Sequence, residues 1–141
     1  MRDESFDRDL DIIMRRKFLE FMRRKESEVE SNLVEVKSIN DFEKLINSNK
    51  PLLIDFWAPW CPPCLFMKPI FETLAKRYVN KIIFVKVNVD EVPDLAQRFG
   101  IFAVPTFIML YRGEEVCRVE GAMPLRVFEN WINNCLRRVR V

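Results

Sequence analysis

Two cysteines separated by two prolines, Cys61 and Cys64, are the residues of this chain best suited to chemistry. An apolar run at 51–54 predicts a buried strand before them, and an amphipathic segment at 65–79 predicts a helix after them. The first turn of a helix has free N–H groups and a partial positive charge, and both stabilise a thiolate. Two thiols this close can form a disulfide with each other or attack a foreign disulfide. The pattern therefore predicts thiol–disulfide exchange.

Two plainer interpretations of the cysteine pair are a structural disulfide and half of a zinc site. A zinc site would need the other two cysteines, Cys117 and Cys135, and their spacing does not form a second zinc knuckle. We therefore predict no metal. The same two cysteines are either buried thiols or a structural disulfide, and the sequence leaves this open.

Composition narrows the class of protein further. The chain has 141 residues, 49% of them hydrophobic and 31% charged, which is typical of one globular domain. The net charge of +2 gives no argument for nucleic-acid binding. The chain has no histidine, which excludes haem attachment through Cys-x-x-Cys-His, a Cys–His hydrolase and histidine-containing zinc sites. No apolar run approaches the roughly 18 residues that span a membrane.

The start of the chain indicates where the protein works. Residues 1–5 lead into no apolar signal-peptide core and are too acidic for a mitochondrial transit sequence, so we expect a cytoplasmic protein. A single glutamine and many Lys, Arg and Glu side chains are typical of a thermophilic source.

The residues around the two cysteines resemble the thioredoxin family. The resemblance rests on Trp-Ala-Pro-Trp-Cys-Pro-Pro-Cys at 57–64, on Asp55, on Pro69 in the following helix, and on Val-Pro-Thr at 104–106. It covers about Leu33 to Leu136. The sequence departs from the family at Pro62, where the family usually has glycine, and in the roughly thirty residues that precede the family's usual start.

The resemblance implies a role for each residue of the redox centre. Cys61, on the exposed side of the motif, is the nucleophile, and the buried Cys64 is the resolving thiol. Asp55 accepts the proton of Cys64, and Lys86 is the partner of Asp55. Burial raises the pKa of a carboxyl group, which suits this proton transfer near neutral pH. The plainer alternatives are that Asp55 is a strand-end carboxylate bonded to solvent and that Lys86 is simply solvated.

The resemblance also implies a surface that binds the substrate. Trp57 packs beneath the site, and Pro69 bends the helix that follows the cysteines. The peptide bond before Pro105 is cis in this family, and the backbone of the residue before it pairs with the substrate chain. The substrate-binding residues are then Trp60, Val104, Pro105, Gly121 and Ala122. For Trp57 and Trp60 the alternative is an ordinary place in the aromatic core. For Pro105 it is a trans proline that opens an edge strand, and for Gly121 it is an ordinary turn residue.

Function and partners follow from the same resemblance. We expect a protein that reduces protein disulfides, needs no bound cofactor because the dithiol is its redox group, and is recycled by a thioredoxin reductase. Expected clients are peroxiredoxins, ribonucleotide reductase or sulfoxide reductases. Alternatives are a disulfide oxidase or isomerase of the same fold, and a non-catalytic binding module. Because Pro62 removes an N–H group beside Cys61, we also expect a potential near the reducing end.

The predicted fold is α/β: the thioredoxin fold, with a mixed central sheet flanked by helices, plus an N-terminal helical extension. Residues 32–141 form this domain, with strands and helices in the order β-α-β-α-β-α-β-β-α. Residues 1–31 form the extension, whose apolar face predicts a helix and whose residues 26–31 predict a polar linker. The extension either docks on its own domain, stays partly disordered, or makes a dimer or partner contact; membrane-surface binding is a further alternative. The apolar face consists of Leu10, Ile13, Met14, Phe18, Phe21 and Met22.

Overall fold

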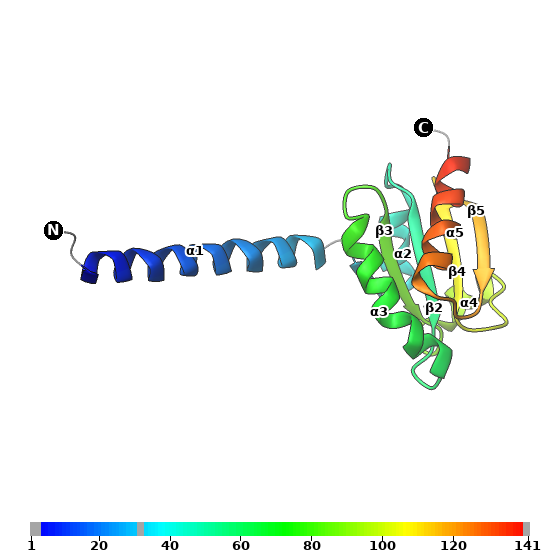
Figure 1. Ribbon diagram of the computed structural model, residues 1–141. Coiled ribbons are helices and arrows are strands. Elements are labelled where there is room, and N and C mark those ends of the chain that lie inside the picture. The colour runs from blue at the N-terminus through cyan, green and yellow to red at the C-terminus, as the bar shows by residue number, and fades with distance from the viewer. Residues whose placement is uncertain (1–3, 31–32, 140–141) are drawn as a thin grey trace. The chain divides into compact units, whose positions relative to one another are not determined.

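The computed structural model describes residues 4–30 and 33–139, and in the first of these segments the side chains of residues 8–22. The chain divides into two compact units, residues 1–31 and 32–141. In the first unit residues 4–30 form one helix, and the second unit holds the sheet and the remaining helices (Figure 1).

Helix α1 spans Glu4–Glu30 and carries an ion pair between Arg15 and Asp11, 3.3 Å apart and one turn apart along the helix. The prediction of a linker at 26–31 is wrong for residues 26–30, which continue the helix, while Ser31 lies outside the described residues. The physical reason is composition: residues 26–30 contain no glycine or proline, and glutamate is a good helix former.

Five strands form one mixed sheet in the second unit. Their order is β1-β3-β2-β4-β5; β1, β3 and β2 are parallel, and β4 and β5 are antiparallel to their neighbours. The strands are β1 Leu33–Val36, β2 Leu52–Trp57, β3 Ile83–Asn88, β4 Thr106–Tyr111 and β5 Glu114–Glu120. Since β2 is the central strand, its carboxyl end brings the cysteine motif to the middle of one edge of the sheet.

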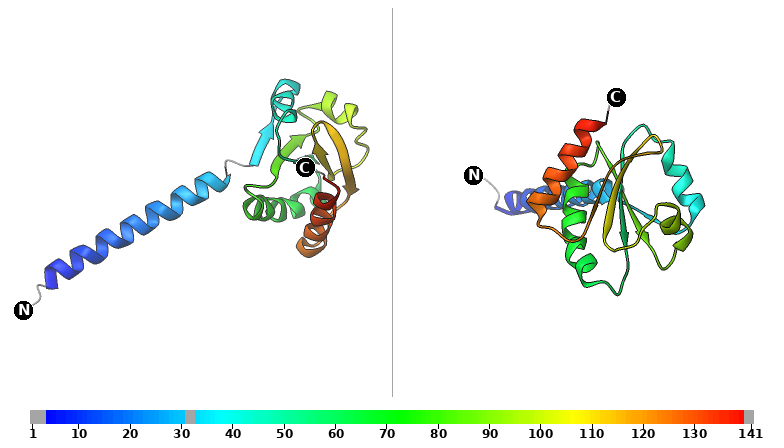
Figure 2. Two further views of the ribbon diagram at one scale, coloured as in Figure 1. Left: turned by 90° about the horizontal axis from the view of Figure 1, so that it is seen from above. Right: turned by 90° about the vertical axis from the view of Figure 1, so that its right-hand side faces the viewer.

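Helices cover both faces of this sheet, as predicted. Helices α3 and α5 lie on one face and α2 and α4 on the other, as the right-hand view of Figure 2 shows. The helices are α2 Ile39–Ile46, α3 Pro62–Arg77, α4 Pro93–Arg98 and α5 Leu125–Arg138. Helix α3 continues through Pro69, and the predicted bend at this residue stays a prediction.

Neighbouring residues of the central strands enter different cores because successive side chains of a strand point to opposite faces. Leu53 packs in the core under α3 and α5, and Ile54 packs in the core under α2 and α4. The ring of Phe71 on α3 lies 4.9 Å from that of Phe84 on β3, centroid to centroid. These contacts fix α3, and with it the cysteine motif, on the sheet.

A disulfide joins Cys117 on β5 to Cys135 on α5. It links the edge strand to the last helix. Of the two alternatives for Cys117 and Cys135, buried thiols or a structural disulfide, the structure has the disulfide. No helix among the described residues is long and apolar enough to cross a membrane.

Candidate functional site

Cys61 and Cys64 form a disulfide at the start of α3, with their Cα atoms 5.3 Å apart. Cys61 is the N-cap residue, in extended conformation, and its Sγ accepts a hydrogen bond of 3.3 Å from the backbone N–H of Cys64. A helix N-terminus favours negative charge, so this position stabilises a thiolate at Cys61 after reduction.

Pro62 and Pro63 occupy the first two positions of α3. Proline suits these positions because their N–H groups lack partners within the helix. It also removes two of the N–H groups that could otherwise point at the sulfur. The N–H of Cys64 is therefore the first backbone donor of the helix.

Both cysteines of the disulfide are buried: Cys61 is 3% exposed and Cys64 is 4% exposed. The prediction that Cys61 lies on an exposed side is wrong for this disulfide. Trp57, Val89 and Val104 pack against the cluster that the two cysteines form with Ala58. A client must therefore reach Cys61 along the surface that these residues form.

Val104, in the loop before β4, brings its backbone to the disulfide. Its carbonyl oxygen lies 3.5 Å from Cys61 Sγ, and the peptide bond between Val104 and Pro105 is cis, as predicted. The carbonyl oxygen of Pro105 accepts a hydrogen bond of 2.9 Å from the N–H of Gly121, and the exposed Ala122 follows. The structure thus brings Val104 to the cysteine pair and Gly121 to the cis proline that follows Val104.

Trp60 lies on the rim of the site and is 67% exposed. Its indole N–H donates a hydrogen bond of 3.0 Å to Asp90 Oδ2, which holds the ring in place. The indole borders a groove of about 420 Å³ that also contains Phe102, which is 94% exposed. The groove is lined by Trp60, Val89, Ile101, Phe102, Ala103 and Val104.

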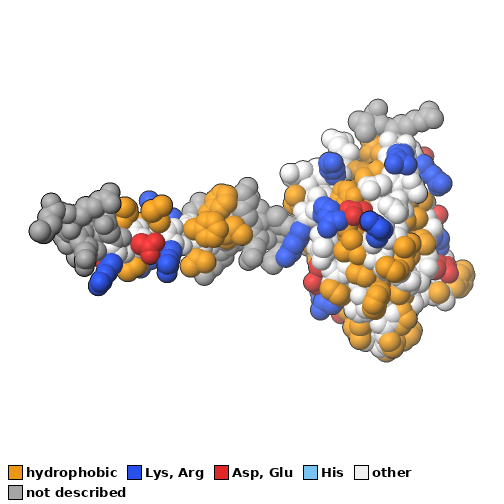
Figure 3. Space-filling model, viewed as in Figure 1, with side chains coloured by type: hydrophobic (Ala, Val, Ile, Leu, Met, Phe, Trp, Pro, Cys, Tyr) orange, Lys and Arg blue, Asp and Glu red, His pale blue; other side chains and the backbone are white. Residues whose placement is uncertain are grey.

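Four lining residues of this groove were not predicted from the sequence: Val89, Ile101, Phe102 and Ala103. They come from the loops after β3 and after α4, where no periodic pattern marks a surface. The signal present was an apolar run at 101–105, just before β4 and outside any helix or strand. Hydrophobic side chains also gather at the end of the domain where α3 begins, at the bottom of Figure 3.

Asp55 lies on β2 in the buried layer next to the site and is 2% exposed. Burial raises the pKa of this carboxyl group to about 7, and the positive charge of Lys86 opposes the rise in part. Among the described residues, neither Asp55 Oδ1 nor the indole nitrogen of Trp57 has a hydrogen-bond partner. An acid in this state can take or give a proton near neutral pH.

Lys86 connects Asp55 to the cysteine pair. It is the β3 residue in register with Asp55, and its Nζ lies 4.6 Å from the centroid of the Trp57 ring. Trp57 in turn packs against the cysteines. The four predicted residues Asp55, Lys86, Trp57 and Cys61 therefore form one continuous chain of neighbours.

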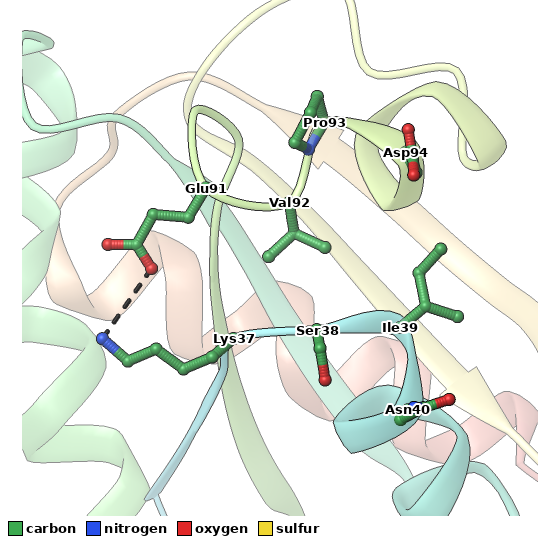
Figure 4. Close-up of a pocket in the computed structure, with 8 residues that line it drawn as sticks. All are labelled: Lys37, Ser38, Ile39, Asn40, Glu91, Val92, Pro93 and Asp94. Atoms are coloured by element: carbon green, nitrogen blue, oxygen red, sulfur yellow. Dashed lines mark ion pairs between the residues drawn. The ribbon is translucent and has the colours of Figure 1, made fainter.

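A second pocket, of about 360 Å³, lies between the starts of α2 and α4 (Figure 4). Its charged side chains Lys37 and Glu91 form an exposed ion pair of 3.7 Å. None of its lining residues is a cysteine, so we assign it no part in the chemistry. In the described part of the chain, no group of three His, Cys, Asp or Glu residues could hold a metal ion.

A disulfide that caps a helix, faces a backbone carbonyl and borders an apolar groove can accept two electrons and return them to a second disulfide. These features define a protein of the thiol–disulfide exchange class, whose redox group is its own cysteine pair.

Comparison with known proteins identifies the family within this class. The thioredoxin family model matches residues 33–134. Thioredoxin M4 of Arabidopsis thaliana chloroplasts is 42% identical over 106 residues, 73% of this chain and 55% of the relative. Thioredoxin of Haemophilus influenzae is 40% identical over 102 residues, 70% of this chain and 95% of the relative. The chain belongs to the thioredoxin family.

Solved structures agree with this assignment. A thioredoxin from Plasmodium falciparum has a TM-score of 0.67 at 33% identity and covers 71% of this chain and 96% of its own. The thioredoxin pre-protein of Schistosoma mansoni has a TM-score of 0.66 at 39% identity and covers 72% of this chain and 96% of its own. The chain spans about half the length of the Arabidopsis relative. Helix α1 lies outside the segment that the family model matches.

Proposed function

We propose that this protein reduces disulfides of client proteins and is recycled by a thioredoxin reductase. The observation that carries the proposal is the Cys61–Cys64 disulfide at the N-terminus of α3, with the Val104 carbonyl 3.5 Å from Cys61 Sγ. A client chain that lies along Val104 would present its own disulfide to the Cys61 sulfur. Clients with peroxidase activity, such as peroxiredoxins, fit the expected class.

The reaction begins with the reduced dithiol. The Cys61 thiolate attacks one sulfur of the client disulfide, forms a mixed disulfide, and releases the other client sulfur as a thiolate that takes up a proton. Cys64 then loses its proton to the Asp55 carboxylate and attacks Cys61 Sγ. The Cys61–Cys64 bond forms, the mixed disulfide breaks, and the second client thiolate leaves and is protonated. Two electrons pass from the protein to the client.

Asp55 is suited to the second step because its pKa is raised to about 7 by burial. Near neutral pH a fraction of the molecules therefore carries the carboxylate that accepts the Cys64 proton. Lys86 acts as a positioning charge: its ammonium group favours the carboxylate form of Asp55. Trp60 and the groove residue Phe102 would hold apolar side chains of the client beside its disulfide.

An oxidase or isomerase is the alternative function on the same fold, and a non-catalytic binding module is a third. Helix α1 lies outside the segment that the family model matches, and it would serve a contact with a second copy or with another partner. The cytoplasmic location and the thermophilic source stay predictions, and the relatives include both chloroplast and bacterial proteins.

A redox titration separates these functions. The full chain carrying Cys117→Ala and Cys135→Ala is equilibrated with defined thiol buffers, and the fluorescence of Trp57 and Trp60 reports the state of the remaining pair. A two-electron transition near about −270 mV is expected for a reductase, whereas a value near about −180 mV would assign an isomerase. If no reversible transition occurs, the binding module is the remaining function.

A Cys64→Ser variant tests the order of the two thiols. It should form a stable mixed disulfide with a client through Cys61, because the resolving thiol is missing. The Cys61→Ser variant is the matched control and should trap no client. A mixed disulfide through Cys64 alone would contradict the assignment of Cys61 as the nucleophile.

A further inference from the structure

The groove beside Trp60 takes four of its lining residues from one short piece of chain between α4 and β4, the 101–104 segment. This segment contains no helix or strand, and Phe102 in it is 94% exposed. A side chain this exposed has few neighbours to hold it, so its position depends on how the two ends of the segment are fixed. On the β4 side, the Pro105 carbonyl oxygen accepts a hydrogen bond of 2.9 Å from the N–H of Gly121. The α4 side needs a support of its own.

Arg118 on β5 supplies the support on the α4 side. Its Nη2 donates a hydrogen bond of 2.7 Å to the Phe99 carbonyl oxygen, and its Nη1 donates one of 3.4 Å to the Gly100 carbonyl oxygen. Phe99 is the C-cap residue of α4, and the last carbonyl groups of a helix lack partners within the helix. A guanidinium group can donate to two acceptors at once, and its positive charge suits the C-terminal end of a helix. Arg118 therefore ties the edge strand to the residues that lead into the 101–104 segment.

A β-bulge in β5 turns Arg118 and Glu115 to the same face of the sheet. In a regular strand, residues three apart point to opposite faces. Arg118 lies opposite Ile108 of β4, and Glu115 lies opposite Leu110. A step of three residues along β5 thus matches a step of two along β4, where the register shifts. Because Ile108 and Leu110 both pack in the core under α2 and α4, the two charged side chains lie on the face that carries α4.

Glu115 orients the guanidinium group of Arg118. Its Oε1 accepts hydrogen bonds from Arg118 Nε at 3.2 Å and from Nη2 at 2.7 Å. The Arg118 side chain is only 30% exposed, so water competes for its N–H groups less than at a fully exposed arginine. Arg118 thus divides its N–H groups between one carboxylate and the two carbonyl oxygens at the end of α4.

We infer that Arg118 is a positioning residue for the client: by holding the end of α4 it keeps Phe102 beside Trp60, where the apolar side chains of the client bind. The inference rests on the proposed function, since the groove acts when a client disulfide reacts with Cys61. A groove wall that is already ordered does not have to be ordered when the client binds. Because the backbone contacts of Arg118 lie at the end of α4, it acts on client binding and not on the exchange step at Cys61.

Hydrogen exchange tests the hold on the 101–104 segment without any client. The N–H of Ile101 donates a hydrogen bond of 2.9 Å to the Ala96 carbonyl oxygen, and its exchange rate, measured by NMR on the full chain, reports opening at the end of α4. Arg118→Met keeps a long side chain but removes the donors, so this rate should rise about tenfold. The matched control Arg126→Met removes an exposed arginine of α5 and should leave the rate unchanged.

The reaction with a protein disulfide tests the effect on the groove. The pre-reduced full chain is mixed with a range of insulin concentrations, and tryptophan fluorescence follows the oxidation of Cys61 and Cys64. For Arg118→Met the half-saturating insulin concentration should rise about fivefold, while the maximal rate and the rate with oxidised glutathione stay at the wild-type values. Glu115→Gln keeps Arg118 and weakens only its orientation, so the rise should be smaller.

Equal exchange of the Ile101 amide in Arg118→Met and Arg126→Met would overturn the inference. An equal loss of rate with insulin and with oxidised glutathione would overturn it as well, because the defect would then lie at the cysteines. If the wild type reduces neither probe, the proposed function fails, and the exchange rate of Ile101 still decides whether Arg118 holds the 101–104 segment.

Discussion

The ammonium nitrogen of Lys86 lies 4.6 Å from the centroid of the Trp57 ring, while Lys86 itself is paired in register with Asp55 on the neighbouring strand. The lysine is thus close enough to favour the Asp55 carboxylate, but burial has the larger effect, and the pKa of Asp55 rises to about 7. The acid next to the disulfide is therefore held in its neutral form below neutral pH, and this has a measurable consequence for stability.

Asp55→Asn should stabilise the oxidised protein at pH 8. Since the pKa of Asp55 is raised in the folded state, the unfolded chain binds fewer protons between pH 4 and 7, and stability falls as pH rises through this window. The wild type should lose roughly 4 kcal/mol of unfolding free energy relative to Asp55→Asn across the window, and nothing further above it. Denaturant midpoints at pH 4, 6 and 8 measure the difference.

Lys86→Met is the matched variant for this prediction. It keeps the carboxyl group and removes the cation that lowers the pKa of Asp55, so the stability loss should extend to higher pH. A difference between wild type and Asp55→Asn that does not vary with pH would contradict the raised pKa.

Phe102→Ala should weaken the reaction with protein clients and leave stability nearly unchanged. The ring is 94% exposed, so its removal should alter the unfolding free energy by less than about 0.5 kcal/mol. It lines the groove beside Trp60, so kcat/KM for a protein disulfide should fall about fivefold, roughly 1 kcal/mol.

A small-molecule disulfide, which does not reach the groove, should react with Phe102→Ala at the wild-type rate. The control is Val127→Ala, an exposed apolar residue on α5 that does not line the groove. If kcat/KM of Phe102→Ala fell equally for the small disulfide and for the protein disulfide, the defect would lie at the cysteines and not in the groove.

Cys117→Ala/Cys135→Ala should lower the unfolding free energy by about 3 kcal/mol. The disulfide closes a loop with a sequence separation of 18 residues, and the chain-entropy model assigns loops of this size about that value. Calorimetry on the oxidised proteins measures the loss. The redox potential of Cys61 and Cys64 should not change, and a shift would mean that the two disulfides are coupled.

Much of this fold follows from sequence pattern. The strands are recognisable in the sequence as apolar runs and the helices as apolar stripes. On α3 this stripe consists of Met67, Phe71 and Leu74, and all three are buried. The exception is residues 26–30, where a polar composition was interpreted as a linker although nothing in it ends a helix. Charge density alone does not separate a linker from an exposed helix, because both lack an apolar core.

The site was predictable to the extent that it lies in continuous motifs. Cys61, Cys64 and the cis bond at Pro105 belong to such motifs, and the structure brings them together. Val89 and Phe102 do not, because they meet Trp60 only through tertiary packing of two loops. The burial of Cys61 was missed for the same reason: Val89 and Val104, which pack against the cysteine pair, lie far away in sequence.

The two prolines after Cys61 give the last prediction, which concerns the thiolate itself. N-cap acceptors normally take hydrogen bonds from the second and third helical N–H groups, and Pro63 leaves only that of Cys64, 3.3 Å from the sulfur. Pro63→Ala, and to a smaller degree Pro62→Gly, should therefore add a donor and lower the pKa of Cys61. Because a more stable thiolate favours the reduced form, the potential should become less negative. The pH dependence of Cys61 alkylation in the Cys117→Ala/Cys135→Ala background measures the pKa, and a rise in either variant would contradict the donor argument.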